Sequence, residues 1–262
     1  MVKYNLPFGM RYSSLVEREN FYNEEFNLKK ISEWIRKRTH FNGLVFAAVI
    51  GRHTKISPLR YSEDASTTII IDEYENLEDV RRYLLDFKPE SVYYDRNIYD
   101  DDHEIVGQEL AFDLDPENID CPIHGTLENK MAKGQGLSFC ELELKMVKEE
   151  TVKLYDELLS TFSDLEVVYS GRGFHIHVFD DDVMRWTYKR RSHFANKIRN
   201  QGFMIDKWVT TGSMRLIRLP YSLHGMVSRI VTPLKISELE DFDPLKDKMS
   251  IPKFLELKRS NL

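Results

Sequence analysis

Apolar residues recur along the chain with two spacings, and each spacing predicts a different kind of element. Where they return every three or four positions among charges, the pattern predicts an amphipathic helix. Such stretches cover residues 14–38, 76–85, 145–162 and 187–200. Short apolar runs bounded by polar or turn-forming residues predict buried strands. These runs lie at residues 41–50, 66–72, 91–94, 108–114, 165–169 and 174–178. Because helices and strands are interspersed, we expect a mixed α/β domain.

One of these predicted strands ends in two acids separated by a single leucine. Asp113 and Asp115 follow an apolar run, and alternate side chains of a strand share a face. Two carboxylates held that close repel each other unless a cation lies between them. Mg²⁺ and Mn²⁺ favour such oxygen ligands. The pattern therefore predicts a divalent-metal site, and the alternative is a strand end whose acids face water.

Composition sets the class of the protein. The chain has 262 residues, of which 42% are apolar and 12% aromatic, enough for one large or two small folded domains. It carries no apolar run long enough to span a bilayer and no signal-peptide layout at its start, which predicts an intracellular protein with no membrane partner. The net charge of -6 does not exclude nucleic acid, because residues 189–191, Arg215 and Arg218 can form local basic patches.

The only two cysteines of the chain lie in or beside an irregular segment that also holds a histidine. Cys121 and His124 have the spacing of two neighbouring ligands in a zinc site, and Cys140 follows a Gly-Gln-Gly turn. A structural site needs a fourth ligand. The candidates are His103, Asp120 and Glu141. The alternative is a loop with two reduced cysteines and no metal.

A second segment with candidate chemistry begins at Ser170. One glycine on each side of Arg172 allows a tight turn whose N–H groups can approach a phosphate, and Ser170 adds a hydroxyl. His175 and His177 follow with strand alternation, so both imidazoles are expected on the polar face. The segment predicts phosphate binding, with no preference between the two histidines.

A third acid and a basic turn follow later in the chain. Asp206 ends an apolar triplet, and a third carboxylate is what a two-metal phosphoryl-transfer site requires. Further on, Arg218 and His224 flank a Pro-Tyr-Ser turn, where they could neutralise a polyphosphate. The alternative is a charged strand and loop without a ligand.

In this order, the segments 112–115, 170–178, 205–206 and 218–225 resemble the archaeo-eukaryotic primase superfamily, and most closely the small catalytic subunits of archaeal DNA primases. Residues 91–94, 209–211 and 239–244 are also similar. The resemblance implies a primase fold with an RRM-like catalytic sheet. It further implies one catalytic domain over 1–262, with a candidate zinc-binding insertion at 116–140.

The same resemblance implies roles for individual residues. Divalent Mg²⁺ or Mn²⁺ would be bound by Asp113, Asp115 and Asp206. The incoming nucleoside triphosphate would be bound by Ser170, Arg172, His175, Arg218 and His224. Structural Zn²⁺ would be bound by Cys121, His124 and Cys140. The implied activity is template-directed synthesis of short RNA primers, or also DNA primers, on single-stranded DNA by two-metal nucleotidyl transfer in DNA replication. The implied partner is a large primase subunit.

The chain also departs from this pattern. Leu137 stands where the family usually has a further cysteine, three residues before Cys140. The chain is compact for the family, and little follows Pro244 beyond a charged tail, so an accessory helical region is expected to be missing or reduced.

Three other functions remain open from the sequence. The acid pair suits an end-joining or repair polymerase of the same superfamily equally well. A metal-dependent phosphohydrolase would use His175 and His177 as ligands beside the aspartates. A non-catalytic nucleic-acid-binding module is the third, and the intact acid triad disfavours it. Release of pyrophosphate with chain growth would separate a polymerase from a hydrolase.

Overall fold

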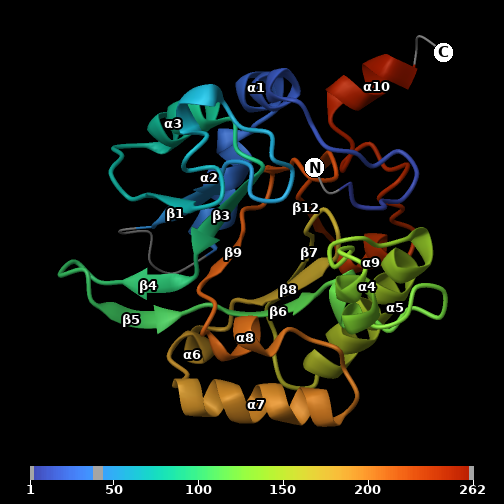
Figure 1. The fold of residues 1–262 in the computed structure, drawn as a ribbon. Coiled ribbons are helices and arrows are strands. Elements are labelled where there is room, and N and C mark those ends of the chain that lie inside the picture. Colours follow the sequence, from blue (N-terminus) through green and yellow to red (C-terminus); the bar gives the residue numbers. More distant parts are fainter. Residues whose placement is uncertain (1–2, 38–43, 260–262) are drawn as a thin grey trace.

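Two four-stranded antiparallel sheets organise the described part of the chain (Figure 1). The computed structural model describes residues 3–37 and 44–259. The first sheet has the order β2 (Thr68–Ile71), β1 (Phe46–Val49), β3 (Ser91–Asp95) and β9 (Leu216–Arg218). The second has the order β12 (Thr232–Leu234), β7 (Leu165–Tyr169), β8 (Phe174–Val178) and β6 (Leu110–Leu114). Two short hairpins pair β4 (Asn97–Tyr99) with β5 (Ile105–Gln108) and β10 (Leu223–His224) with β11 (Arg229–Ile230).

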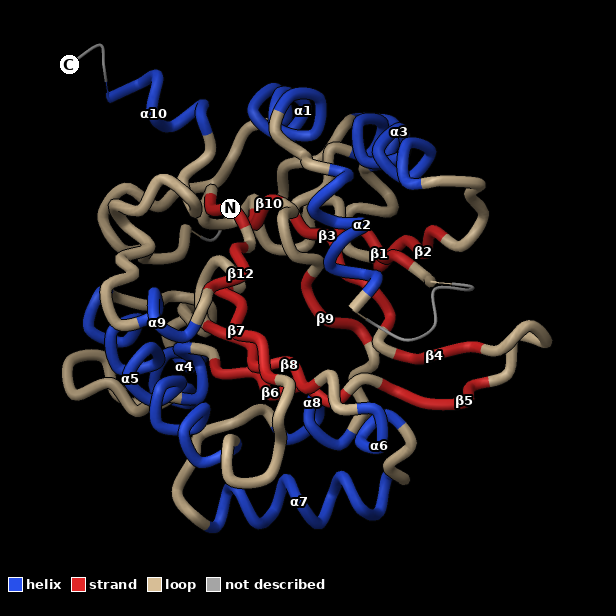
Figure 2. The backbone as a smooth tube through the Cα atoms, turned by 180° about the vertical axis from the view of Figure 1, so that it is seen from behind, coloured by secondary structure: helices blue, strands red, loops and turns tan. Residues whose placement is uncertain are grey.

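The helices gather in two groups, as both views show (Figures 1 and 2). Near the first sheet lie α1 (Leu15–Glu24), α2 (Leu28–Arg36) and α3 (Leu77–Phe87). Around the second sheet lie α4 (Leu127–Ala132), α5 (Glu141–Leu158), α6 (Asp181–Met184), α7 (Tyr188–Asn200), α8 (Lys207–Thr211) and α9 (Ile236–Leu239). Towards the C-terminus lies α10 (Lys253–Arg259), and short 3₁₀ turns occur at η1 (Leu59–Tyr61) and η2 (Pro116–Asn118).

The alternation of β6 and β8 separates a core face from a chemical face. Phe112 and Ile176 are fully buried in one apolar cluster with Val147 of α5 and Ile198 of α7. The intervening residues of β6 and β8 point to the opposite side of the sheet, as expected for strands. The register pairs Asp113 with His175 across the two strands. The apolar residues therefore anchor the sheet on α5 and α7, and the polar ones face the first sheet.

The predicted helix over 14–38 is wrong as a single element. α1 and α2 are separate helices, because the Asn27 side chain accepts a hydrogen bond from the N–H of Lys30 and starts a new helix there. Residue 38 lies outside the described residues.

Other predicted elements are confirmed with shifted ends. Asn76 caps α3 as expected, with its side chain bonded to the N–H groups of Glu78 and Asp79. The strand predicted at 41–50 is β1, and residues 41–43 lie outside the described part. The strand predicted at 108–114 is interrupted at Glu109, which separates β5 from β6. None of the helices in the described ranges has the length and apolar character needed to cross a bilayer.

Candidate active site

One cavity of about 360 Å³ lies between the two sheets and contains every residue predicted to bind catalytic metal or nucleotide. These residues are Asp113, Asp115, Asp206, Ser170, Arg172, His175, Arg218 and His224. The second sheet supplies Asp113 and His175, and Asp115 directly follows its strand β6, whereas β9 of the first sheet supplies Arg218. Positions more than a hundred residues apart in sequence thus form one site.

Backbone contacts bring the third acid to the first two. The N–H of Asp206 donates to the carbonyl of Asp113 at 2.9 Å, which joins the start of α8 to β6. The Asp206 carboxylate caps α8 by accepting the N–H of Trp208 at 2.7 Å. Asp115 directly follows β6 and begins η2. All three carboxylates consequently line the same cavity.

The acids destabilise one another's charge. Burial raises the pKa of Asp113 well above its usual value, and the charges of Asp115, Asp206 and Glu117 raise it further. Burial also raises the pKa of Asp115, although Arg172 opposes the effect. Because a nearby cation would favour both charged forms, this arrangement suits a divalent metal.

The turn between β7 and β8 approaches the acids through its glycines. A Cβ atom on Gly173 would lie 2.1 Å from the Leu114 carbonyl oxygen and 2.6 Å from Oδ1 of Asp115. Gly171 has φ +101°, and a Cβ there would lie 2.7 Å from the His224 ring. The Ser170 hydroxyl accepts the N–H of Gly173 at 3.1 Å and closes the turn. Only glycine fits these contacts, which supports the predicted close approach of the backbone to a ligand.

Arg172 is held by an acid that the sequence did not single out. Its Nη2 donates to Glu117 at 2.6 Å, and its guanidinium lies 5.4 Å from the centre of the Phe139 ring. Burial alone would lower the pKa of Arg172, but Glu117 and Asp115 outweigh burial and raise it. Arg172 is therefore a fixed cation at the edge of the acids.

Arg218 and His224 form a second basic group in the cavity. Nη2 of Arg218 donates to the Tyr93 hydroxyl at 3.1 Å, and the guanidinium lies 4.8 Å above the Tyr93 ring. Burial, followed by the charges of Arg218 and Arg172, lowers the pKa of His224 well below its usual value. Burial first, and then the charges of His177 and Arg218, lower the pKa of His175 well below its usual value. Both imidazoles are thus neutral near pH 7 in the ligand-free protein.

Several buried polar atoms of the cavity make no hydrogen bond within the described ranges. They are Asp113 Oδ1, Arg172 Nε, His175 Nδ1, Arg218 Nη1 and His224 Nδ1. Buried polar atoms normally have partners, so such a group marks the place of a ligand. The carboxylate oxygens fit a hard divalent ion, and the N–H donors fit phosphate oxygens.

His177 does not join this site. It is fully buried beside the cavity, with Nδ1 2.5 Å from Oε1 of Glu109, and the Tyr94 hydroxyl donates to the same carboxylate at 2.9 and 3.1 Å. The expectation that both histidines share a polar face holds for the direction of the side chains, but His177 does not line the cavity. The metal-ligand role of His177 in a phosphohydrolase therefore lacks support.

Sequence reasoning missed two basic residues of the cavity, Arg52 and His53, which follow β1. They form no motif, and the only signal was a basic pair directly after a glycine at the end of a buried strand. It also predicted no role for Tyr93 and Glu117, which hold Arg218 and Arg172.

The candidate zinc ligands lie together outside the cavity. One ligand atom from each of Cys121, His124, Cys140 and Glu143 lies within 4.8 Å of all the others. The fourth member is Glu143, so the three candidates suggested by the sequence are wrong as members of this group. Glu143 also accepts the Lys130 ammonium at 2.7 Å and the N–H of Cys140 at 2.8 Å. Two thiols, an imidazole and a carboxylate are a donor set that suits tetrahedral zinc.

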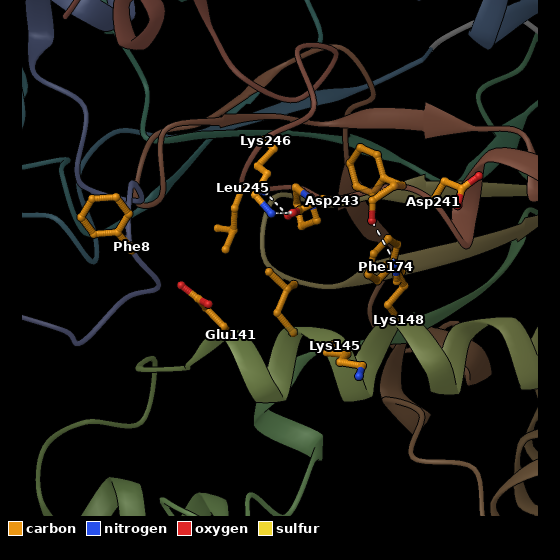
Figure 3. Close-up of a pocket in the computed structure, with 12 residues that line it drawn as sticks. Phe8, Glu141, Lys145, Lys148, Phe174, Asp241, Asp243, Leu245 and Lys246 are labelled. Atoms are coloured by element: carbon orange, nitrogen blue, oxygen red, sulfur yellow. Dashed lines mark hydrogen bonds and ion pairs between the residues drawn. The ribbon is translucent and has the colours of Figure 1, made fainter. Parts of the chain in front are cut away.

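A larger cavity of about 820 Å³ lies between α5 and residues 241–246 (Figure 3). Three of its charged side chains already have partners: Lys246 pairs with Asp243 at 2.8 Å, and Lys148 donates to the carbonyl of Phe242 at 3.0 Å. None of the residues predicted to bind catalytic metal or nucleotide lines it. We therefore assign the candidate active site to the smaller cavity.

Comparisons with known proteins bear on the fold and the family that the sequence predicts. The family described as DNA primase small subunit matches residues 112–204. An uncharacterized DNA primase small subunit-like protein of Archaeoglobus fulgidus is 48% identical, over 97% of this chain and 95% of that protein. The DNA primase small subunit PriS of Pyrococcus horikoshii is 28% identical, over 69% of this chain but only 47% of that protein.

Among solved structures, the polymerase domain from Mycobacterium tuberculosis Ligase D in complex with DNA has a TM-score of 0.57 at 10% identity. The match covers 100% of this chain and 95% of that domain. The likeness confirms the predicted mixed α/β fold of the primase type. The near-complete match to the Archaeoglobus fulgidus relative and the family match together confirm the resemblance seen in the sequence, and the chain belongs to the DNA primase small subunit family.

Proposed function

We propose that the chain is a DNA-dependent nucleotidyltransferase that makes short RNA primers, or also DNA primers, on a single-stranded DNA template. The observation that carries the proposal is one cavity in which the three aspartates meet the turn of Ser170 and Arg172, with Arg218 and the histidines beside them. Membership of the primase small subunit family supports it. We propose residues 1–262 as a single catalytic domain.

The cavity residues divide the work of this reaction. Asp113, Asp115 and Asp206 would hold Mg²⁺ or Mn²⁺, which when bound supplies Lewis-acid assistance to the attacking hydroxyl and the leaving pyrophosphate. Arg218 and Arg172 neutralise and orient the triphosphate, and the turn at Ser170 offers it N–H groups. The acids fix the reacting groups in line rather than forming a covalent intermediate.

Synthesis without a primer tests this function. The purified chain is incubated with single-stranded DNA, labelled ribo- or deoxyribonucleoside triphosphates, and Mg²⁺ or Mn²⁺. We expect oligomers from the parent chain and none from an Asp113→Asn, Asp115→Asn double variant. An Asp181→Asn, Asp182→Asn variant, which removes two exposed acids of α6 outside the cavity, is the matched control and keeps activity.

The other outcomes of this experiment are informative. Extension only from a supplied primer would favour an end-joining or repair polymerase. Release of phosphate without chain growth would favour a phosphohydrolase and contradict the proposal. We also propose that a large primase subunit is the partner; adding one is expected to raise primer-free initiation and to leave extension of a supplied primer unchanged.

A structural Zn²⁺ is a separate proposal. Cys121, His124, Cys140 and Glu143 would hold it and so link the insertion at 116–140 to the start of α5. Protein purified without chelator is expected to contain one zinc per chain, and Cys121→Ser is expected to abolish zinc binding. Glu143→Gln tests the fourth ligand, because full zinc content in that variant would exclude the carboxylate. Absence of zinc from the parent chain would contradict the whole site.

A further inference from the structure

The turn after β1 places two basic side chains in the active-site cavity. Arg52 and His53 follow Gly51, and both line the cavity together with Arg218 and His224. They follow a strand of the first sheet, whereas Asp113 lies in the second sheet's β6 and Asp115 follows it. A ligand between the sheets is thus within reach of this turn from the side opposite the acids.

Hydrogen bonds from Arg18 hold this turn rigidly in place. The buried Arg18 donates to the carbonyl groups of Ile50 at 2.9 Å and Ile56 at 3.0 Å, and to the Thr54 hydroxyl at 3.0 Å. A Cβ on Gly51 would lie 2.6 Å from the Ile56 carbonyl oxygen, so the chain closes tightly here. Side chains on this turn are pre-organised, which reduces the entropy lost on binding a ligand.

His53 is oriented by a buried carboxylate. Its Nδ1 lies 2.6 Å from Oε1 of Glu90, and Oε2 of Glu90 accepts the N–H groups of His53 at 3.1 Å and Thr54 at 2.8 Å. Because Nδ1 is engaged, Nε2 is the nitrogen available to a ligand. The side chain keeps 32% exposure and lines the cavity, so that nitrogen is accessible.

Arg52 brings a positive charge without a carboxylate partner in the described residues. Its Nε donates to the Ser66 carbonyl at 2.9 Å and its Nη2 to the Thr68 hydroxyl at 2.7 Å, and both acceptors are neutral. These two bonds fix the plane of the guanidinium. The remaining donors can meet an anion, and a planar fork of donors matches phosphate oxygens.

His53 lies near the other basic groups of the cavity. The pKa of His224 is lowered by burial first, then by Arg218 and Arg172, and also by His53. The imidazole of His53 is therefore close enough to act on His224. A polyphosphate bound by Arg218 and His224 would lie within the same cluster.

We propose that Arg52 and His53 form a second phosphate-binding wall of the cavity and contact the triphosphate of the incoming nucleotide. The inference rests on the proposed function for the identity of the ligand. With Nδ1 engaged by Glu90, the imidazole of His53 presents Nε2 to the phosphate. Glu90 and Arg18 are positioning residues, since they touch the turn and not the ligand.

Direct binding tests this wall. The probes are a nucleoside triphosphate with a non-transferable α,β-imido link, measured with Mg²⁺ by titration calorimetry, and a labelled single-stranded DNA, measured by fluorescence anisotropy. Arg52→Gln and His53→Gln are each expected to weaken triphosphate binding about 10-fold, the loss of one charge-assisted contact, and to change DNA binding less than about 2-fold.

Matched controls and a conservative variant complete the test. Arg199→Gln and His193→Gln change exposed residues of α7 outside the cavity and are expected to leave both affinities unchanged. Arg52→Lys keeps the charge and loses the fork, so an intermediate affinity for the triphosphate is expected. Thermal unfolding of each variant at the parent temperature verifies that the turn remains folded.

Two results would overturn the inference. Unchanged triphosphate affinity in the Arg52→Gln, His53→Gln double variant would show that these residues do not bind the triphosphate. Weaker DNA binding with unchanged triphosphate binding would assign the turn to a backbone phosphate of the template. Primer synthesis by the parent chain is judged separately. If the parent chain makes no polymer, the proposed function is contradicted. Loss of triphosphate affinity in the variants would still support this binding site.

Discussion

Glycines at Gly171 and Gly202 share a φ of +101° but differ in what surrounds them. A Cβ on Gly171 would meet the His224 ring, whereas a Cβ on Gly202 would have nothing within 4 Å. Comparing alanine variants at the two positions therefore separates the free-energy cost of a side chain at positive φ from the effect of crowding the cavity. Both alanine variants should lose about 1–2 kcal/mol of unfolding free energy, because the left-handed conformation disfavours a side chain.

Only Gly171→Ala should also affect the ligand. We expect it to lower triphosphate affinity at least about 10-fold, since His224 must move, and Gly202→Ala to leave that affinity unchanged. Chemical denaturation and calorimetry on the two variants measure both effects. Equal triphosphate affinities would show that the contact between the turn and His224 does not matter for binding.

The third acid has a prediction of its own. Asp206→Asn keeps an N-cap for α8 but removes one charge from the carboxylates, so metal-dependent synthesis should fall by about two orders of magnitude or more. The fold should survive, because asparagine caps helices as well as aspartate does. Unchanged synthesis in this variant would separate Asp206 from the site of Asp113 and Asp115.

Glu90 makes the stability of the folded protein depend on pH. Burial would raise its pKa, but the hydrogen bonds and charge of His53 and the bonds of Thr54 outweigh burial and lower it from 4.5 to about 2. The unfolded chain therefore binds the proton more tightly, and stability present above about pH 4.5 is lost as pH falls towards 2. From a shift of that size we expect a loss of about 3 kcal/mol across this window.

Denaturant unfolding at a series of pH values measures this effect. The parent chain should lose stability between pH 5 and pH 3 relative to Glu90→Gln, which lacks the ionisable group. A constant difference between the two proteins over that range would show that Glu90 is not the carboxylate that holds the turn.

At the residue scale, the acids and the basic turn could be predicted from the sequence because they belong to short motifs. Arg52 and His53 escaped notice since no motif contains them, and only the packing of β1 beside β3 brings them to the cavity. The zinc group shows the same limit. Glu143 lies three residues beyond the expected region 116–140, at the third position of α5, and its contact with Cys140 depends on how α5 begins.

At the scale of elements, periodicity predicted the longer strands β1, β2, β3, β6, β7 and β8, but it missed the short strands β4 and β9 to β12 and predicted the helix ends less well. Alternation over β6 and β8 correctly separated Phe112 and Ile176 from Asp113 and His175. The break between α1 and α2 was missed because apolar residues continue through it, and only the cap at Asn27 marks the new helix. A capping residue inside an apolar pattern thus carries more information than the pattern itself.

At the scale of the whole molecule, both sheets join distant parts of the chain. β9 pairs with β3 in the first sheet, and β12 pairs with β7 in the second. Neither sheet is complete without residues beyond 215. We therefore predict one cooperative unfolding transition for the full chain, and a truncation after residue 204, the end of the family match, should not fold.

Calorimetry of the full chain and circular dichroism of the truncated chain measure this prediction. Agreement between the calorimetric and van't Hoff enthalpies would support a single unit. Two resolved transitions, or a folded truncation, would show that the proposed single domain over 1–262 consists of two.

The placement of acids and bases on different sheets also determines how a ligand enters. Asp113 and Asp115 lie on one wall, where Arg172 is paired with Glu117, and Arg52 and Arg218 lie on the other, so an electric field crosses the cavity from the first sheet to the second. A metal-bound triphosphate carries its cations at one side and its phosphate oxygens at the other. Such a dipolar ligand is turned by the field before it touches either wall, and reversed docking is rejected during approach rather than after binding.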